Sequence, residues 1–216
     1  MIGVLYICEE GRLVLTIGLC GGSGTGKTTA QTAFAEAGVP GLDTDVLYHE
    51  LIAGDTPLSR KMIEIFGECI RLENGGIDRR RLAGLVFGDA ASAERRAILN
   101  KITHEAVLAE CRIFLSKMKE AGVYAALINA PLLFESGFAE ECDITVAITA
   151  PRSMRIERIM VRDGITRHAA EQRIDAQLDD AFLVANTDYR IHNDGSEADL
   201  RQAVANLITQ IKSTEE

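Results

Sequence analysis

The chain has 216 residues, a length that suits one compact domain with room for smaller inserted lobes. Hydrophobic residues make up 47% and charged residues 25%, the balance of a globular protein with a core. The formal net charge of -9 argues against a general nucleic-acid binder, which would carry a basic excess. An anionic small substrate remains compatible with it, because a few clustered arginines can bind phosphate on an acidic protein.

The five cysteines are scattered and form no C-x-x-C pair, so we interpret them as reduced, small and buried hydrophobic residues. The N-terminus is apolar, but Glu9, Glu10 and Arg12 interrupt it and no basic segment precedes it. We therefore expect no signal peptide, no membrane partner and a cytoplasmic location. Residues 1–12 are interpreted either as an extra strand that turns at Glu10-Gly11 or as a loose extension.

From Leu13 onward, short aliphatic runs alternate with helical patterns. Helix starts are indicated by Pro57, Ser92 and Ser196, and helix ends by glycines such as Gly38. The expected elements, in chain order, are a strand at 13–19, a helix at 26–37, a strand at 39–43, helices near 46–53, from 57 and at 78–87, a long helix at 92–120, strands at 123–130 and 144–148, helices at 151–162 and 167–178, a strand at 189–192 and a last helix from 196.

This alternation predicts a parallel sheet covered by helices on both faces. Residues 54–120 hold mostly helical patterns and no clear strand, which predicts a helical lobe inserted between the second and third strands. In its first helix we expect the buried side to consist of Met62, Ile63, Ile65 and Phe66.

Residues Gly21 to Thr28 satisfy the phosphate-loop pattern G-x-x-x-x-G-K-[ST], with a strand before it and a helix after it. Glycines permit positive φ and let backbone N–H groups converge on phosphate oxygens, while the helix directs its positive end at the same anion. Lys27 can reach the β- and γ-phosphates, and the Thr28 hydroxyl can ligate Mg²⁺. The predicted ATP-binding residues of this segment are Gly22, Ser23, Gly24, Thr25, Gly26, Lys27, Thr28 and Thr29.

Two other classes of phosphate-loop protein fit poorly. A GTPase would carry an Asn/Thr-Lys-x-Asp motif, whereas Asn100-Lys101 is followed by Ile102-Thr103 inside a predicted helix. Motor and transporter ATPases usually end the third strand with an acidic residue, whereas residues 126–131 contain none. The small size, the inserted lobe and the later arginines favour a small-molecule kinase. A kinase for nucleosides, nucleotides or shikimate and a non-catalytic ATP-binding regulator remain alternatives.

Several ordered motifs resemble the dephospho-CoA kinase family from about Thr16 to Leu207. They are Leu42-Asp43-Thr44-Asp45, Gly76-Ile77-Asp78-Arg79 with Leu82 and Val86-Phe87, Leu99 with Ile102 and His104, Pro131-Leu132-Leu133-Phe134-Glu135, Arg158 with Arg162-Asp163-Gly164 and Gln177, and Ile191 with Asn193 and Gly195. The sequence departs from the family pattern at Glu105, where proline is usual, at Cys20, where threonine is common, and in residues 1–12. The resemblance implies transfer of the ATP γ-phosphate to the ribose 3′-hydroxyl of dephospho-CoA.

We therefore predict a single P-loop kinase domain over residues 1–216, with a three-layer α/β/α fold and a five-stranded parallel sheet. The parts expected are a core at 13–53, 121–150 and 185–212, a substrate-binding lobe at 54–120 and a helical lid at 151–182. The expected partners are ATP with Mg²⁺ and dephospho-CoA. We expect no nucleic-acid partner. The expected oligomeric state is a monomer or a small homo-oligomer.

Asp43 and Asp45 lie at the carboxyl end of the second strand, where open α/β sheets bind ligands. If the chain is extended there, both side chains can face the same side. A carboxylate at this place could bind the acceptor hydroxyl and take its proton, and the resemblance favours Asp45 as this catalytic base. The alternative is that Asp45 caps the following helix.

Six arginines, at positions 152, 155, 158, 162, 167 and 173, follow the fourth strand. Arg158 and Arg162 lie four residues apart on one helical face and match the family positions, so we predict that both bind ATP phosphates and that Arg158 takes part in catalysis. We expect the other four to form a solvated face.

The remaining predicted contacts each have an alternative. Arg79 opens a helix, where a basic residue opposes the macrodipole, so an anionic substrate would explain it better than local stability; Arg80 and Arg81 are weaker candidates. His104 is a candidate substrate contact or a packed histidine. Glu135 is a candidate substrate residue that contacts Mg²⁺ through water, or it pairs with an arginine. Asn193 is a candidate adenine contact or a turn residue.

Overall fold

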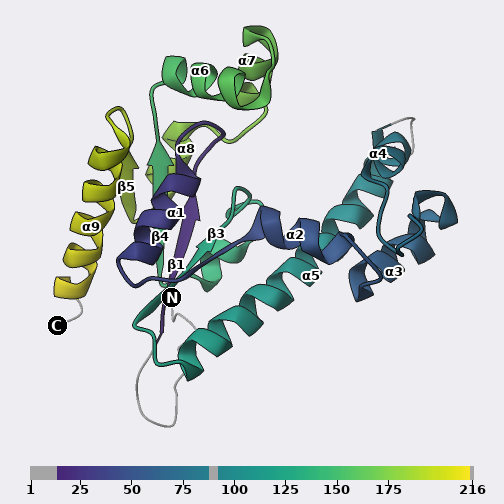
Figure 1. The fold of residues 1–216 in the computed structure, drawn as a ribbon, viewed down its shortest axis with the longest axis horizontal. Helices are drawn as coiled ribbons and strands as arrows, with labels where there is room; N and C mark the ends of the chain where they lie inside the picture. The colour runs from purple at the N-terminus through teal and green to yellow at the C-terminus, as the bar shows by residue number, and fades with distance from the viewer. Residues whose placement is uncertain (1–13, 88–91, 215–216) are drawn as a thin grey trace. The chain divides into compact units, whose positions relative to one another are not determined.

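The computed structural model describes residues 14–87 and 92–214 (Figure 1). The chain forms two compact units, one made of the residues up to Leu42 together with those from Leu115, and the other of Asp43–Phe114. The interpretation of residues 1–12 lies outside the described residues.

A five-stranded parallel sheet forms the centre of the first unit, as predicted. Its strands are β1 (Leu15–Cys20), β2 (Gly41–Asp43), β3 (Ala125–Asn129), β4 (Ile144–Thr149) and β5 (Tyr189–His192). Their order in the sheet is β2-β3-β1-β4-β5. On its two sides, Ile17 of β1 pairs with Leu127 of β3 and with Ile144 of β4. The phosphate-loop segment therefore leaves the carboxyl end of the central strand.

The helices follow the predicted order, with one addition. They are α1 (Lys27–Glu36), α2 (Thr44–Ile52), α3 (Pro57–Phe66), α4 (Arg79–Phe87), α5 (Ser92–Glu120), α6 (Arg152–Asp163), α7 (Arg167–Asp175), α8 (Asp180–Asn186) and α9 (Glu197–Thr214), with short 3-10 turns η1 (Glu68–Ile70) and η2 (Phe138–Glu141). Ser196 and Asp199 exchange hydrogen bonds, so a capping box opens α9 at the helix start that Ser196 indicated. Helix α8 was not predicted, although Asp179 caps it by accepting from the Ala181 N–H.

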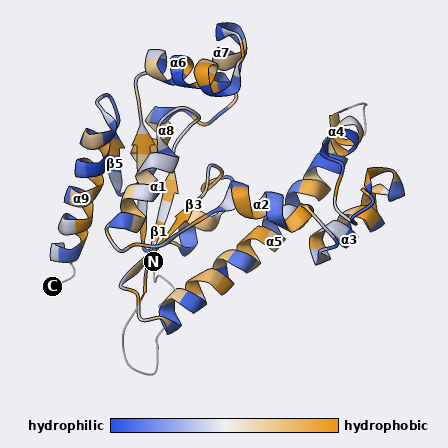
Figure 2. Cartoon of the chain, in the orientation of Figure 1, coloured by the Kyte–Doolittle hydropathy of each residue, from blue (hydrophilic) through white to orange (hydrophobic). Residues whose placement is uncertain are grey.

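The two faces of the sheet have different neighbours because side chains alternate along each strand. On one face Ile17 and Leu19 join a buried cluster with Phe34 of α1 and Val204 of α9, and α1 packs against α9 (Figure 1). On the other face a Cβ on Gly18 would lie 2.7 Å from the Cys142 Sγ. Strands β1 and β3 are hydrophobic along most of their length, whereas α9 carries both kinds of residue (Figure 2). This is the pattern of a doubly covered parallel sheet.

The second unit has a hydrophobic core of its own. Met62 is fully buried in it, and Ile63 and Phe66 pack partly buried against it, as predicted. The expectation for Ile65 was wrong, because this side chain is 41% exposed. Ile65 lies at the edge of the apolar stripe of α3, beyond the residues that face the cluster.

No helix that the structure describes is both long and apolar enough to cross a membrane. In the described part of the chain, Cys20, Cys69, Cys111 and Cys142 form no disulfide. Cys20 and Cys111 are buried as predicted, whereas Cys69 is exposed.

Candidate functional site: a phosphate loop held by lid residues

The phosphate loop joins β1 to α1 through glycines with positive φ. Gly24 has a φ of 79° and Gly26 a φ of 99°, values that residues with a side chain rarely adopt. At Gly26 there is also no room for one, because a Cβ would lie 2.4 Å from the Asn193 Nδ2. Both the backbone conformation and the close packing therefore require glycine at this position.

Helix α1 begins immediately after the loop, at Lys27. Within the described residues, no acidic side chain lies in its first turn and no side-chain oxygen caps its N-terminus. The first N–H groups and the positive end of the helix dipole are thus directed to the space in front of the loop. This is the arrangement that binds phosphate at a helix N-terminus.

Thr25 stabilises the loop from inside. Its side chain is fully buried, and its hydroxyl donates to the Gly22 carbonyl over 2.8 Å. The Thr25 N–H donates to the same carbonyl over 3.3 Å. The hydroxyl of this predicted ATP-binding residue is therefore engaged within the loop itself.

Asn193, which directly follows β5, is hydrogen-bonded to the phosphate loop. Only 6% of the residue is exposed, and its side-chain amide donates to the Thr25 carbonyl over 2.8 Å. Its backbone N–H donates to the Thr149 carbonyl over 2.7 Å. The alternative of an ordinary turn residue is wrong, since the side chain ties the last strand to the phosphate loop. Contact with adenine stays a prediction.

The charges of Lys27 and Glu135 both act on Cys20, the last residue of β1. Burial raises the pKa of Cys20 to about 12, the Lys27 ammonium partly opposes this shift, and the Glu135 carboxylate adds to it. The same sulfur thus senses both charges. The substrate role of Glu135 stays a prediction.

The lid arginines differ in what they contact. Arg158 is half-buried and its Nη1 donates to the Gly24 carbonyl over 3.2 Å, so it lies at the loop, while its contact with phosphate stays a prediction. Arg162 forms a bidentate pair with Asp163, at 2.7 and 2.9 Å. Arg173 also binds Asp163. Together these partners hold the pKa of Asp163 at about 2, with the Arg162 hydrogen bond the largest cause.

The expected solvated face holds for three of the four remaining lid arginines. Arg152, Arg167 and Arg173 have side chains 52%, 58% and 44% exposed. The expectation was wrong for Arg155, which is 4% exposed and contacts the phosphate loop. Its environment depends on residues far along the chain, which helical spacing does not show.

The second unit holds the two aspartates of the predicted acceptor site. Asp43 ends β2 and caps α2, because its Oδ1 accepts from the N–H groups of Asp45 at 2.9 Å and Val46 at 3.1 Å. The alternative that Asp45 caps this helix was therefore wrong. The extended geometry expected for the pair was also wrong, since Asp45 lies in the first turn of α2, where it is exposed.

Arg79 begins α4 in the same unit. Burial raises the pKa of Tyr48, and the Arg79 guanidinium opposes this shift. Asp78 accepts from the N–H groups of Arg80 and Arg81 at 3.0 Å and pairs with the Arg81 side chain at 3.3 Å. This acidic cap offsets the unfavourable charge at the helix start and gives Arg81 a local structural role.

His104 is half-buried in the middle of α5. Its neighbour Glu105, which replaces the usual proline of the resembled family, pairs with Lys61 at 3.7 Å. The substrate role of His104 stays a prediction.

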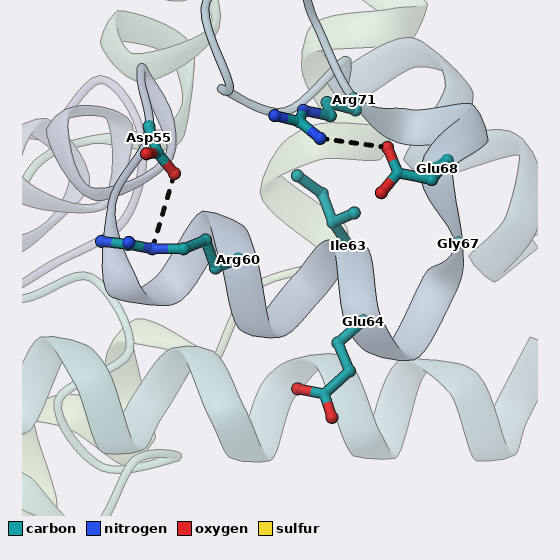
Figure 3. Close-up of a pocket in the computed structure, with 7 residues that line it drawn as sticks. All are labelled: Asp55, Arg60, Ile63, Glu64, Gly67, Glu68 and Arg71. Atoms are coloured by element: carbon teal, nitrogen blue, oxygen red, sulfur yellow. Dashed lines mark hydrogen bonds and ion pairs between the residues drawn. The ribbon is translucent and has the colours of Figure 1, made fainter.

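A pocket of about 590 Å³ lies in the second unit, next to α3 (Figure 3). The residues that line it are Asp55, Arg60, Ile63, Glu64, Gly67, Glu68 and Arg71. Arg60 pairs with Asp55 at 3.5 Å and Arg71 with Glu68 at 3.4 Å, and Glu64 points away from both pairs (Figure 3). Both guanidinium groups of the pocket therefore already have carboxylate partners, and no predicted site residue lines it.

The donors at the loop fit a nucleotide-bound Mg²⁺. Among the described residues, no group of three or more His, Cys, Asp or Glu could form a metal cage. Thr28 is exposed in the first turn of α1, next to Lys27. A hydroxyl oxygen there suits Mg²⁺, which usually combines one or two protein oxygens with water and substrate phosphates.

Comparison with known proteins identifies one family. Residues 15–199 match the family model described as dephospho-CoA kinase. The protein named dephospho-CoA kinase from Geobacter sulfurreducens is 32% identical over 191 residues, which cover 88% of this chain and 95% of that protein.

Two solved structures share the fold over almost the whole chain. TT1252 from Thermus thermophilus has 27% sequence identity and a TM-score of 0.75, with 91% of this chain and 97% of that chain covered. A dephospho-CoA kinase from Campylobacter jejuni has 26% identity and a TM-score of 0.68, with 93% and 98% covered.

Proposed function

Because the chain belongs to the dephospho-CoA kinase family, we propose that it transfers the γ-phosphate of ATP to the ribose 3′-hydroxyl of dephospho-CoA. The products are coenzyme A and ADP. This reaction is the final step of coenzyme A synthesis. The observation that supports this function most is the loop from Gly21 to Gly26, followed by an uncapped helix N-terminus that carries Lys27.

The loop residues Gly22 to Thr29 bind the ATP phosphates in this proposal. Lys27 neutralises the β- and γ-phosphates, and the Thr28 hydroxyl holds a Mg²⁺ that draws charge from the transferred group. Arg158, which already contacts the Gly24 carbonyl, is near enough to the loop to stabilise the equatorial oxygens. Arg162 joins it by exchanging Asp163 for a phosphate. Asn193 lies next to the adenine.

Asp45 is the general base for the acceptor hydroxyl in this proposal. Its exposure and the capping of α2 by Asp43 support the role, since the Asp45 carboxylate is not needed as the cap. Asp43 and Arg79 assist in binding the acceptor, with Arg79 directed to its pyrophosphate. His104 and Glu135 complete the substrate contacts.

The parts of the chain have separate roles in this scheme. Residues 54–120 bind dephospho-CoA, and residues 151–182 close over ATP and exclude water from the reaction. Positioning and charge neutralisation supply most of the rate acceleration. We place the protein in the cytoplasm, where ATP is abundant, as a monomer or small homo-oligomer.

The direct test is to incubate the pure protein with ATP, Mg²⁺ and dephospho-CoA and to weigh the product. We expect the mass of one added phosphate, and no such product from Lys27→Ala. A panel with nucleosides, nucleotides and shikimate separates this activity from that of other small-molecule kinases. ATP binding without acceptor-stimulated ADP release would indicate a non-catalytic regulator and refute the proposal.

A further inference from the structure

Arg155 of α6 is buried, whereas four other lid arginines are exposed. Its side chain is 5% exposed, against 44% to 59% for Arg152, Arg162, Arg167 and Arg173. Burying a guanidinium costs free energy unless its charge and its N–H groups have partners. The contacts that compensate this cost show what the residue does.

The guanidinium of Arg155 binds three separate acceptors. Its Nε donates to the Ser23 carbonyl over 3.0 Å, at the tip of the phosphate loop. Its Nη1 pairs with the Asp180 Oδ1 at 2.9 Å, and its Nη2 donates to the Gln177 Oε1 over 3.3 Å. One side chain thus connects the loop to the segment after α7 and to the first residue of α8.

Gln177 contacts the same loop residue from the other side. Its Oε1 accepts from the Ser23 N–H over 2.8 Å, and its Nε2 donates to the Ser23 Oγ over 3.2 Å. The N–H, the carbonyl and the hydroxyl of Ser23 are therefore all engaged by two side chains, Arg155 and Gln177, that also contact each other. The orientation of the Ser23 peptide depends on this network.

The loop glycines leave the space that the network needs. A Cβ on Gly22 would lie 2.1 Å from the Arg155 Nη2 and 3.0 Å from the Gln177 Oε1. A Cβ on Gly24 would lie 2.7 Å from the Arg155 carbonyl oxygen. The tip of the loop and the start of α6 are thus packed to van der Waals contact, and a side chain at either glycine would force them apart.

We propose that Arg155 is a positioning residue that orients the tip of the phosphate loop for nucleotide binding, through its bonds to the Ser23 carbonyl, Asp180 and Gln177. This role rests on the proposed ATP-dependent function and differs from that of Arg158, which is assigned to the phosphates. By binding the Ser23 carbonyl, Arg155 fixes the Ser23–Gly24 peptide plane, and with it the direction in which the Gly24 N–H is presented to a phosphate. Asp180 holds the guanidinium in place through a charge-assisted hydrogen bond.

The role of Arg155 decides how its loss affects nucleotide affinity. A residue that shapes the loop affects ATP and ADP alike, because both nucleotides place phosphates in the same cradle. A residue that binds the γ-phosphate affects ATP alone. Acceptor binding is unaffected, since no contact of Arg155 named above involves an acceptor residue.

The test compares Arg155→Met and Arg155→Lys with Arg152→Met, an exposed control whose ion pair with Asp175 measures 2.7 Å. Dissociation constants for ATP and ADP come from calorimetry, the Michaelis constants of both substrates from the kinase assay, and folding from thermal unfolding. We expect Arg155→Met to raise both nucleotide dissociation constants by about tenfold, as the loss of one to two net hydrogen bonds implies. The KM for the acceptor stays within about twofold of the wild-type value, and Arg152→Met matches the wild type on every measure.

Arg155→Lys keeps the charge but cannot reach three acceptors at once, so it should recover only part of the affinity. If Arg155→Met does not fold, the nucleotide affinities of Arg155→Lys test the proposal instead. A folded Arg155→Met or Arg155→Lys protein with wild-type affinity for both nucleotides would overturn the proposal. So would a loss of affinity confined to ATP, or an equal loss of affinity in Arg152→Met. Because calorimetry needs no acceptor, the loop role can stand even if dephospho-CoA is not the substrate.

Discussion

Replacing Asn193 with alanine removes one buried hydrogen bond beneath the phosphate loop. The bond from its side-chain amide to the Thr25 carbonyl is 2.8 Å long, and the residue is only 6% exposed. Little water can reach the carbonyl that is left behind. An unsatisfied buried acceptor costs about 1–3 kcal/mol, so we expect the free energy of unfolding to fall by about 2 kcal/mol.

Asn186 provides a matched control on the surface. Its side-chain amide donates to the Phe182 carbonyl over the same 2.8 Å, but the residue is exposed. Water replaces the lost partner there, so Asn186→Ala should change the free energy of unfolding by no more than about 0.5 kcal/mol. The two substitutions remove the same chemical group and bond length, and differ in burial.

The assay is urea unfolding of both variants without nucleotide, followed by calorimetry with Mg²⁺ and ADP. Asn193→Ala should also weaken ADP binding, by up to about tenfold, because Thr25 lies within the cradle. Asn186→Ala should bind ADP as the wild type does. Equal stability losses in the two variants would refute the reasoning, since burial would then not decide the cost. So would an Asn193→Ala protein of unchanged stability.

Three further predictions concern the base, the thiols and the lid. Asp45→Asn should retain ATP binding and lower turnover by roughly 10²–10⁴-fold in a steady-state ADP-release assay; near-normal turnover would exclude Asp45 as the base. In alkylation at about neutral pH followed by peptide mass analysis, exposed Cys69 should react far faster than Cys20, whose thiol is buried and has its pKa raised to about 12; similar rates would contradict this. Since Arg162 lowers the pKa of Asp163 from 3.8 to about 2, the ionised carboxylate stabilises the fold above pH 3.8 and this stabilisation is lost as pH falls through 2. The difference in unfolding free energy between the wild type and Asp163→Asn should therefore be constant near neutral pH and shrink in acid, and a difference that does not change with pH would refute this assignment.

The sequence predicted which strands and helices form better than it predicted where each of them begins and ends. The aliphatic runs and glycine stops predicted each strand of the sheet, but β2 covers Gly41–Asp43 rather than residues 39–43. Helix α7 ends at Asp175 rather than near residue 178. Strand ends depend on which backbone groups find partners on a neighbouring strand, and that is decided by the packed sheet.

Helix α8 was missed although its start has a local signal. Asp179 and Asp180 precede an apolar group, and Asp179 accepts from the Ala181 N–H as a cap. The helix has only seven residues, too few to give a periodic pattern of its own. This short helix matters for the site, because its first residue, Asp180, is the ionic partner of Arg155.

The sequence by itself determined the phosphate loop, because the cradle is built from consecutive residues whose conformation depends on glycine, lysine and the start of one helix. The tertiary structure alone decided which arginine is buried against that loop. The partners of Arg155 lie 132, 22 and 25 residues away along the chain, at Ser23, Gln177 and Asp180. A long side chain takes its environment from whatever the fold packs around it, and helical spacing cannot distinguish a buried arginine from its exposed neighbours.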